Sequence, residues 1–223
     1  YRLVHHASNG RSVYSFCMCP GGTVVAATSE AQRVVTNGMS QYSRNERNAN
    51  AGIVVGITPA DYPGPRLTNG QVHPLAGIAL QRALESHAYV LGGSTYQAPG
   101  QRVGDFLANR PSTVLGGVVP SYQPGVHLTN LETALPDFAI TAIREALPVF
   151  GKKINDFDMP DAMLTGVETR TSSPLCITRG DDFQSINTQG LYPGGEGAGY
   201  AGGILSAAVD GIKLAEALVG CVR

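Results

Sequence analysis

The glycine-rich stretch near the C-terminus is the feature that most constrains how this chain can fold. Gly197, Gly199 and Gly202 have the spacing Gly-x-Gly-x-x-Gly, and mostly small and apolar residues follow them. Glycines at this spacing let backbone N–H groups approach an anionic or polar ligand at the start of a helix. The pattern alone is a weak signal, so its position in the chain determines its interpretation.

That position excludes a complete dinucleotide-binding unit. A Rossmann βαβ unit needs a second strand after the helix, and the helix predicted over residues 200–219 uses nearly all the residues that follow Gly202. A P-loop is also excluded, because no Lys-Ser or Lys-Thr follows the glycines. Two interpretations remain open. One is a terminal strand–Glu–glycine–helix element that binds a ligand, and the other is tight packing of the last helix on a sheet.

The composition predicts a folded domain with few charges. Hydrophobic residues make up 43% of the 223 residues, charged residues 15%, and the formal net charge is −1. Without a basic block, nucleic acids and anionic membranes are poor candidates for partners. The chain shows no signal peptide and no apolar run long enough to span a bilayer, and its four cysteines lack the spacing of a zinc site. We therefore expect a cytoplasmic protein without a metal site.

Short apolar and β-branched runs alternate with a few helical patterns along the chain. Strands are predicted over residues 12–18, 23–28, 33–36, 52–58, 114–119, 161–168 and 175–178, and helices over 75–87, 101–107, 137–147 and 200–219. Pro20-Gly21-Gly22 reads as a turn, and residues 61–74 read as a long connection. This succession predicts an α+β fold with a mixed or antiparallel sheet and a few packing helices.

The tail resembles the closing flavin-binding segment of flavoproteins with two dinucleotide-binding domains. In those folds an apolar strand ends at Gly-Asp or Gly-Glu, the acid holds the ribityl chain, and the next helix points its N-terminus at the pyrimidine side of the flavin. Gly195-Glu196 followed by Gly202-Gly203-Ile204 matches this pattern. The resemblance implies FAD contacts at Gly195, Glu196, Gly197, Gly199, Tyr200, Ala201, Gly202, Gly203 and Ile204.

Four other stretches are similar to the C-terminal half of a bacterial family of uncharacterised FAD-dependent dehydrogenase-like proteins. They are residues 15–22, 36–40, 47–51 and 168–174. In that family the ADP-binding Gly-x-Gly-x-x-Gly lies near the N-terminus, and residues 1–190 contain no such strand–glycine–helix unit. The resemblance therefore implies that the N-terminal FAD-binding Rossmann part of the protein is absent from this chain.

The same resemblance implies a division of the chain. Residues 1–185 would form an α+β domain on the substrate side, similar to a cap, and residues 186–223 the strand and helix that close the flavin site. The fragment would be inactive alone, and the intact protein would bind FAD and an unknown small-molecule substrate. The low charge fraction is compatible with a covered surface, including that of a homo-oligomer.

Cys17, Cys19 and Arg170 are the candidate catalytic residues. Two thiols near a flavin could exchange electrons as a dithiol–disulfide pair, although a Cys-x-Cys disulfide is strained. The alternative is two buried cysteines that pack as small hydrophobic residues. Arg170 could bind a substrate carboxylate or offset the charge of a reduced flavin, or it could pair with Glu168 or another acid. Arg179 has a similar, weaker case.

Asn48 and Asn50 alternate with alanine and therefore share one face of a strand. They are interpreted as polar groups of a turn or sheet edge, able to donate hydrogen bonds if a ligand lies nearby. Taken together, the sequence favours the C-terminal portion of an FAD-dependent oxidoreductase. The alternatives are a non-catalytic binding or assembly module, whose glycine tail serves packing alone, and a thiol oxidoreductase.

Overall fold

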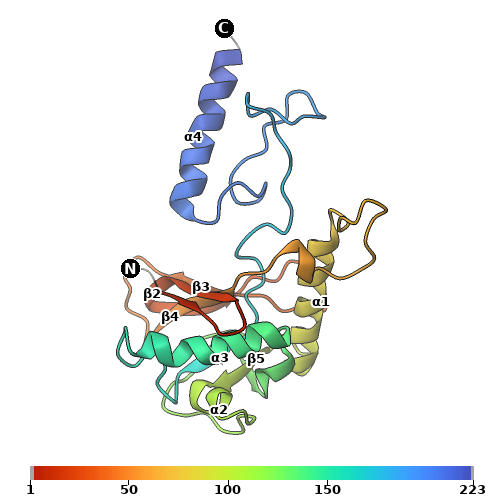
Figure 1. Ribbon diagram of the computed structural model, residues 1–223. Helices are drawn as coiled ribbons and strands as arrows, with labels where there is room; N and C mark the ends of the chain where they lie inside the picture. The colour runs from red at the N-terminus through yellow and green to blue at the C-terminus, as the bar shows by residue number, and fades with distance from the viewer. Residues whose placement is uncertain (1–2, 222–223) are drawn as a thin grey trace. The chain divides into compact units, whose positions relative to one another are not determined.

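The structure, a computed structural model, describes residues 3–221, which divide into two units (Figure 1). Unit 1 contains the residues up to Thr58 together with Arg82–Thr169, and unit 2 contains Pro59–Gln81 together with the residues from Arg170 onward. The second break therefore falls after Thr169, earlier than the boundary expected after residue 185. Unit 2 also includes an internal segment that the sequence did not assign to it.

Strands are confined to unit 1 in the described part of the chain. The strands are β1 (Leu3–His6), β2 (Ser12–Ala26), β3 (Thr36–Ser40), β4 (Asn48–Val55), β5 (Ala98–Arg102), β6 (Val126–Leu128) and β7 (Met163–Thr165). The helices are η1 (Pro59–Asp61), α1 (Ala76–Leu91), α2 (Val103–Leu107), η2 (Leu131–Thr133), α3 (Asp137–Gly151) and α4 (Ile204–Cys221). The predicted mixture of helices with antiparallel and mixed sheets is confirmed.

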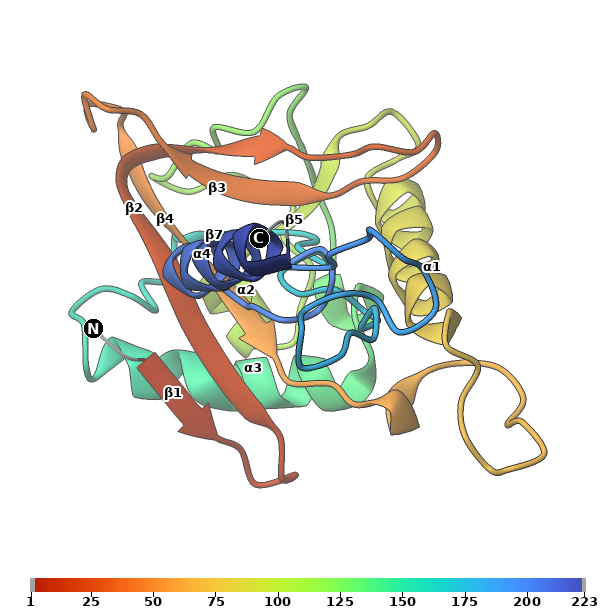
Figure 2. The same cartoon turned by 90° about the horizontal axis from the view of Figure 1, so that it is seen from above.

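β2 is the centre of the larger sheet and pairs antiparallel with β1, β3 and β4 (Figure 2). The predicted turn at Pro20-Gly21-Gly22 is wrong, because β2 continues through it. Register shifts on both sides of Cys19 mark bulges, which bend a strand without ending it. Gly21 has φ +53°, and a Cβ there would lie 1.9 Å from the carbonyl oxygen of Arg44, in the loop between β3 and β4. Only glycine therefore allows the strand to approach this loop so closely.

The smaller sheet has β5 at its centre, with β6 parallel and β7 antiparallel to it. Helix α3 contacts β1, β2 and β4 of the larger sheet. Its buried residues recur at helical spacing and form much of the core of unit 1: Ala139, Ile140, Ala142, Ile143, Ala146, Leu147 and Phe150. The helix predicted over 137–147 is thus confirmed and extends to Gly151.

Three predicted strands are not formed, and of the one predicted over residues 33–36 only Thr36 is in a strand, as the first residue of β3. Residues 114–119 are irregular, and Val114, Leu115 and Val119 are exposed rather than paired in a sheet. Residues 175–178 and the stretch leading into the glycines are turns and loop. An extended segment becomes a strand only where a neighbouring edge accepts its hydrogen bonds, and the described part of unit 2 contains no strand to pair with. The predicted C-terminal strand–turn–helix is therefore a loop, a glycine-rich turn and a helix.

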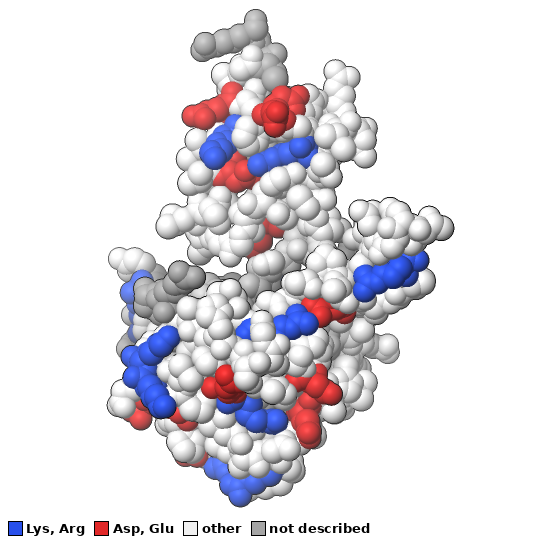
Figure 3. All heavy atoms as spheres, viewed as in Figure 1, with Lys and Arg blue, Asp and Glu red and all other residues white. Residues whose placement is uncertain are grey.

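Charged side chains of both signs are interspersed on the face drawn in Figure 3, without a large patch of one sign. None of the helices within residues 3–221 is both long and apolar enough to cross a bilayer.

Candidate functional site

Three glycines of the tail are required by the chain's own structure. Gly195 and Gly199 have φ values of +66° and +85°, which glycine adopts without the strain of a side chain. A Cβ on Gly194 would lie 1.9 Å from Cδ1 of Leu214 in α4. These positions shape the turn and let it pack on α4.

Three other glycines have no such explanation. A Cβ on Gly197 would meet nothing within 4 Å, and on Gly202 and Gly203 the nearest atoms would be 4.0 and 3.9 Å away. None of the three has a positive φ. Neither backbone conformation nor packing within the described part of unit 2 requires glycine there. A group outside the chain that approaches the backbone closely would require it.

The turn is attached to α4 by an ion pair. Nη2 of Arg179 lies 2.6 Å from Oδ1 of Asp210, and Oδ2 of Asp210 accepts a hydrogen bond from the backbone N–H of Gly195 at 2.8 Å. These bonds lower the pKa of Asp210 to about 2, the bond from Arg179 having the larger effect. The guanidinium also lies 3.7 Å from the centre of the Tyr200 ring. Arg179 and Tyr200 therefore have structural roles in unit 2.

The first residues of α4 are exposed. Ile204 and Leu205 are 85% and 82% exposed, and the first turn contains no acidic residue. The first N–H groups of a helix lack partners within it and carry partial positive charge. Glu196 is exposed in the turn before the helix. The expected flavin contacts thus lie on one continuous turn and helix start, and this set fits a flavin: amide donors for its pyrimidine oxygens and a carboxylate for ribityl hydroxyls.

The loop after Thr169 lies beside this turn in unit 2. Oγ of Ser172 is 4.0 Å from the position that a Cβ on Gly202 would take. Oγ1 of Thr171 is buried without a hydrogen-bond partner, whereas Ser173 donates to the carbonyl oxygen of Leu175. Arg170 is exposed. The structure therefore brings the polar loop to the glycines, and the role of Arg170 stays a prediction.

Cys17 and Cys19 lie on β2 and are not joined in a disulfide. Cys17 has φ +51°, so the alternation of a regular strand does not apply here. Its side chain is exposed, which makes the interpretation of two buried cysteines wrong for Cys17. Burial and the charge of Glu168 raise the pKa of Cys19, which lowers its thiolate fraction.

A cavity of about 580 Å³ lies entirely within unit 1. Its walls are mainly apolar and include Val103, Phe106, Ile140, Ile143, Phe157 and Leu164. Strands β2, β3 and β4 supply another wall, which includes Gly38, Asn50 and Gly52. The cavity could not be predicted from the sequence. The local signal for it is the run of small residues around Asn50 on β4, Ala49, Ala51 and Gly52, which leaves space beside the strand.

Glu168 is a half-buried acidic group that lines this cavity. A Cβ on Gly52 would lie 3.2 Å from Oε2 of Glu168, so the carboxyl group lies against β4. It has no hydrogen bond or ion pair among the described residues. Burial raises its pKa. The sequence interpretation of Glu168, as a partner for Arg170, missed this position.

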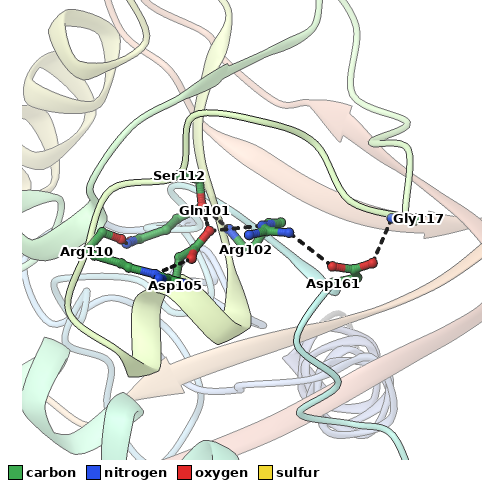
Figure 4. A network of polar contacts seen from close by, with 7 residues as sticks. All are labelled: Gln101, Arg102, Asp105, Arg110, Ser112, Gly117 and Asp161. Carbon is green, nitrogen blue, oxygen red and sulfur yellow. Dashed lines mark hydrogen bonds and ion pairs between the residues drawn. The ribbon is translucent and has the colours of Figure 1, made fainter.

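The most extensive polar network lies elsewhere in unit 1 (Figure 4). Asp105 accepts hydrogen bonds from Arg102, Arg110 and Ser112, and Arg102 also contacts Asp161. These bonds lower the pKa of Asp105 to about 2, and the hydrogen bond from Arg102 has the largest effect. Because its carboxylate is fully engaged, the network ties the end of β5 and the loop after α2 to this helix rather than offering a reactive group. Residues 3–221 contain no cluster of three or more His, Cys, Asp or Glu side chains that could hold a metal.

The fold is an α+β domain, and its chain continues into a glycine-rich turn and a helix. A family model described as "FAD-dependent protein, C-terminal domain-like" matches residues 1–171, and the chain belongs to this family. The matched region contains every residue of the cavity and ends before the glycine tail.

The chain is also similar to a protein of Clostridium beijerinckii that bears the name "Uncharacterized protein". The two are 51% identical over 220 residues, which cover 98% of this chain and 40% of that protein. The chain thus spans about two fifths of the length of this relative.

Proposed function

We propose that this chain is the C-terminal portion of an FAD-dependent oxidoreductase and that its glycine tail contacts the flavin in the intact protein. The observation that carries the proposal is the set of three glycines, Gly197, Gly202 and Gly203, that nothing in the described part of unit 2 requires. They lie directly before a helix start whose first turn is exposed. Membership of an FAD-dependent family supports FAD as the group that covers them.

Each part of the tail would hold a different part of the cofactor. The carboxylate of Glu196 would accept hydrogen bonds from ribityl hydroxyls, and the backbone N–H groups from Gly202 to the first turn of α4 would donate to the pyrimidine oxygens. The Arg179–Asp210 pair would keep the turn in place. The flavin supplies the hydride chemistry, while this chain orients it and excludes water.

The remaining FAD contacts would come from a part of the protein that this chain does not contain. Residues 1–190 lack an ADP-binding strand–glycine–helix unit, and the matched region makes up 40% of the relative's length. We propose that the ADP-binding Rossmann unit lies in the rest of a longer protein. In this proposal the protein is bacterial and cytoplasmic, unit 1 acts on the substrate side, and the isolated chain is inactive.

Replacement of Glu196 tests this proposal in the full-length protein. Glu196→Ala should lower flavin occupancy, measured by absorbance in the flavin band per purified chain, and leave the circular dichroism spectrum unchanged. Glu216→Ala, an exposed acid on α4, is the matched control and should retain the flavin. A full-length protein that never retains flavin, even after reconstitution, would contradict the proposal.

A non-catalytic binding or assembly module is the second candidate, and the surface of α4 favours it. The helix exposes a set of large apolar side chains: Ile204, Leu205, Val209, Ile212, Leu218 and Val219. Exposed apolar surfaces of this kind often mark interaction sites. Unchanged flavin occupancy in Glu196→Ala, together with a defined dimer in dilute sedimentation runs, would favour assembly over cofactor binding.

A further inference from the structure

The cavity of unit 1 has the properties of a built binding site. Its volume of about 580 Å³ lies within the range of small-molecule pockets, about 300–1,000 Å³. We propose that this cavity binds a small, uncharged and mainly hydrophobic molecule whose polar end carries a hydrogen-bond donor beside an acceptor, as in a lactam or a primary amide. The inference does not depend on flavin, because every residue that lines the cavity belongs to unit 1.

Glu168 determines the polar end of this molecule. Its carboxyl group enters a mainly apolar space and has no partner among the described residues. Burial raises the pKa of the group, so the neutral form persists to higher pH than in an exposed glutamate and is the form that the ligand meets under mildly acidic conditions. A neutral carboxyl group has one O–H donor beside one carbonyl acceptor, and its best complement is a group that presents an acceptor beside a donor. A lactam or primary amide does so without adding a charge.

Asn50 is a second polar group without a partner at the same wall. Both its carboxamide nitrogen and its carboxamide oxygen are buried and make no hydrogen bond. A buried amide that serves packing alone would be replaced without loss by an apolar side chain, because an unpaired polar group carries its full desolvation penalty. Rotation of this side chain toward the cavity would give a ligand one further donor and one further acceptor.

Two glycines make room for these polar groups. A Cβ on Gly38 would lie 2.1 Å from Oδ1 of Asn50, and one on Gly52 would lie 3.2 Å from Oε2 of Glu168. Neither glycine has a positive φ, so backbone conformation does not require them. The sheet therefore omits a side chain at both places where one would displace the carboxamide or the carboxyl group.

The apolar walls require the rest of the ligand, away from its polar end, to be hydrophobic. Phe106, Ile143 and Phe157 belong to the side of the cavity formed by helices and loops. Apolar walls with a few convergent polar groups are the usual construction of small-molecule sites. The remaining ionisable groups are Arg47 and Asp156, which line the cavity and are otherwise exposed, and Cys19, whose pKa is raised in part by Glu168.

Calorimetric titration of this chain with 2-quinolinone, a bicyclic lactam, at mildly acidic pH, where the raised pKa keeps Glu168 protonated, tests the proposal. We expect saturable binding that is about tenfold tighter than that of quinoline, which has the same shape and no lactam N–H donor or carbonyl acceptor. Quinoline-2-carboxylate, an anion, should bind more weakly than the lactam. Equal affinity for all three compounds, or no saturable binding of 2-quinolinone to the folded chain, would overturn the proposal.

Variants separate a binding role from a structural one. Glu168→Leu should abolish the preference for the lactam, whereas Glu168→Gln, whose amide also presents a donor beside an acceptor, should retain it. In the unmodified chain the affinity should fall as the pH rises through the pKa of Glu168, and in Glu168→Gln it should not. Asn50→Leu should weaken binding, and Glu46→Leu, on an exposed loop, is the matched control. A lactam preference that survives in Glu168→Leu would overturn the assignment.

The full-length protein supplies the last arm of the test. If 2-quinolinone binds this chain but does not bind the full-length protein, another segment of the same protein fills the cavity and the proposal fails. Saturable binding to both, with the same loss in Glu168→Leu, is the expected result.

Discussion

Oδ2 of Asp210, in the second turn of α4, accepts a hydrogen bond from the backbone N–H of Gly195, in the turn before the helix, at 2.8 Å. The same carboxylate pairs with Arg179, which also donates to the carbonyl oxygen of Pro193. One side chain of the helix, Asp210, therefore binds both the backbone N–H of Gly195 and the guanidinium of Arg179. The geometry of the proposed flavin contacts depends on this carboxylate, although it does not belong to them.

Asp210→Ala should release the turn from the helix. We expect the amide hydrogen of Gly195 to exchange with solvent faster, because it loses its acceptor, and the unfolding free energy to fall by about 1–3 kcal/mol as Arg179 is left without its partner. Hydrogen–deuterium exchange and urea denaturation measure the two effects. Glu216→Ala on the same helix is the control, and equal exchange at Gly195 in both variants would contradict this account.

Gly199→Ala should lower the stability of the chain, whereas Gly202→Ala should lower flavin occupancy and leave stability unchanged. A Cβ on Gly199 would lie 2.5 Å from the carbonyl oxygen of Leu175, and this residue has φ +85°, so we expect a loss of stability of about 1–3 kcal/mol. Gly202 has open space, so Gly202→Ala should leave the melting temperature unchanged and reduce flavin occupancy in the full-length protein. Full flavin retention in Gly202→Ala would argue against close approach of a ligand to this glycine.

Glu168→Gln should stabilise the chain at neutral pH. Burial raises the folded-state pKa of Glu168 above 4.5, its ordinary value, so folding favours the protonated form. Its contribution to stability is therefore complete below about pH 4.5 and is lost as the pH rises through the folded-state pKa. We expect Glu168→Gln to melt at a higher temperature than the unmodified chain at pH 7–8, with the difference vanishing near pH 4. A constant difference across this range would show that ionisation of Glu168 is not its cause.

The two thiols on β2 should react at different rates. Cys17 is exposed, whereas Cys19 is half-buried and its pKa is raised, so its thiolate is the scarcer nucleophile. In a titration with an aromatic disulfide reagent, Cys17→Ser should remove a fast phase that Cys19→Ser leaves in place. Cys176→Ser identifies the contribution of Cys176, which is also exposed. A Cys17–Cys19 disulfide found by mass spectrometry under mild oxidation would instead support the redox interpretation of this pair.

Several helices could be predicted because their signals are local. The apolar positions of α3 recur every three or four residues after Pro136, and they are the positions that the structure buries. Strand assignments were less reliable because a strand also needs a partner. Val114, Leu115 and Val119 resemble a strand by residue type, yet they lie exposed in a loop.

Pro20-Gly21-Gly22 is the converse case, in which residues typical of a turn belong to a strand. These residues are typical of a turn, but β2 continues through them, because bulges and pairing with β3 and β4 hold the strand together. The expected strand before the glycine tail is also absent, since no strand lies in the described part of unit 2 to receive it.

The sequence by itself determined the helical positions, the resemblance to an FAD-dependent family and the place of the glycine tail, because these depend on residue type and on spacing along the chain. Only the tertiary structure distinguished Gly194, Gly195 and Gly199, which the fold requires, from Gly197, Gly202 and Gly203, which it leaves open. It also brought Glu168 against β4, beside Gly52, in a single cavity. The physical reason is that steric contact, burial and pKa depend on neighbours in space, and residues far apart in the sequence become neighbours only when the chain folds.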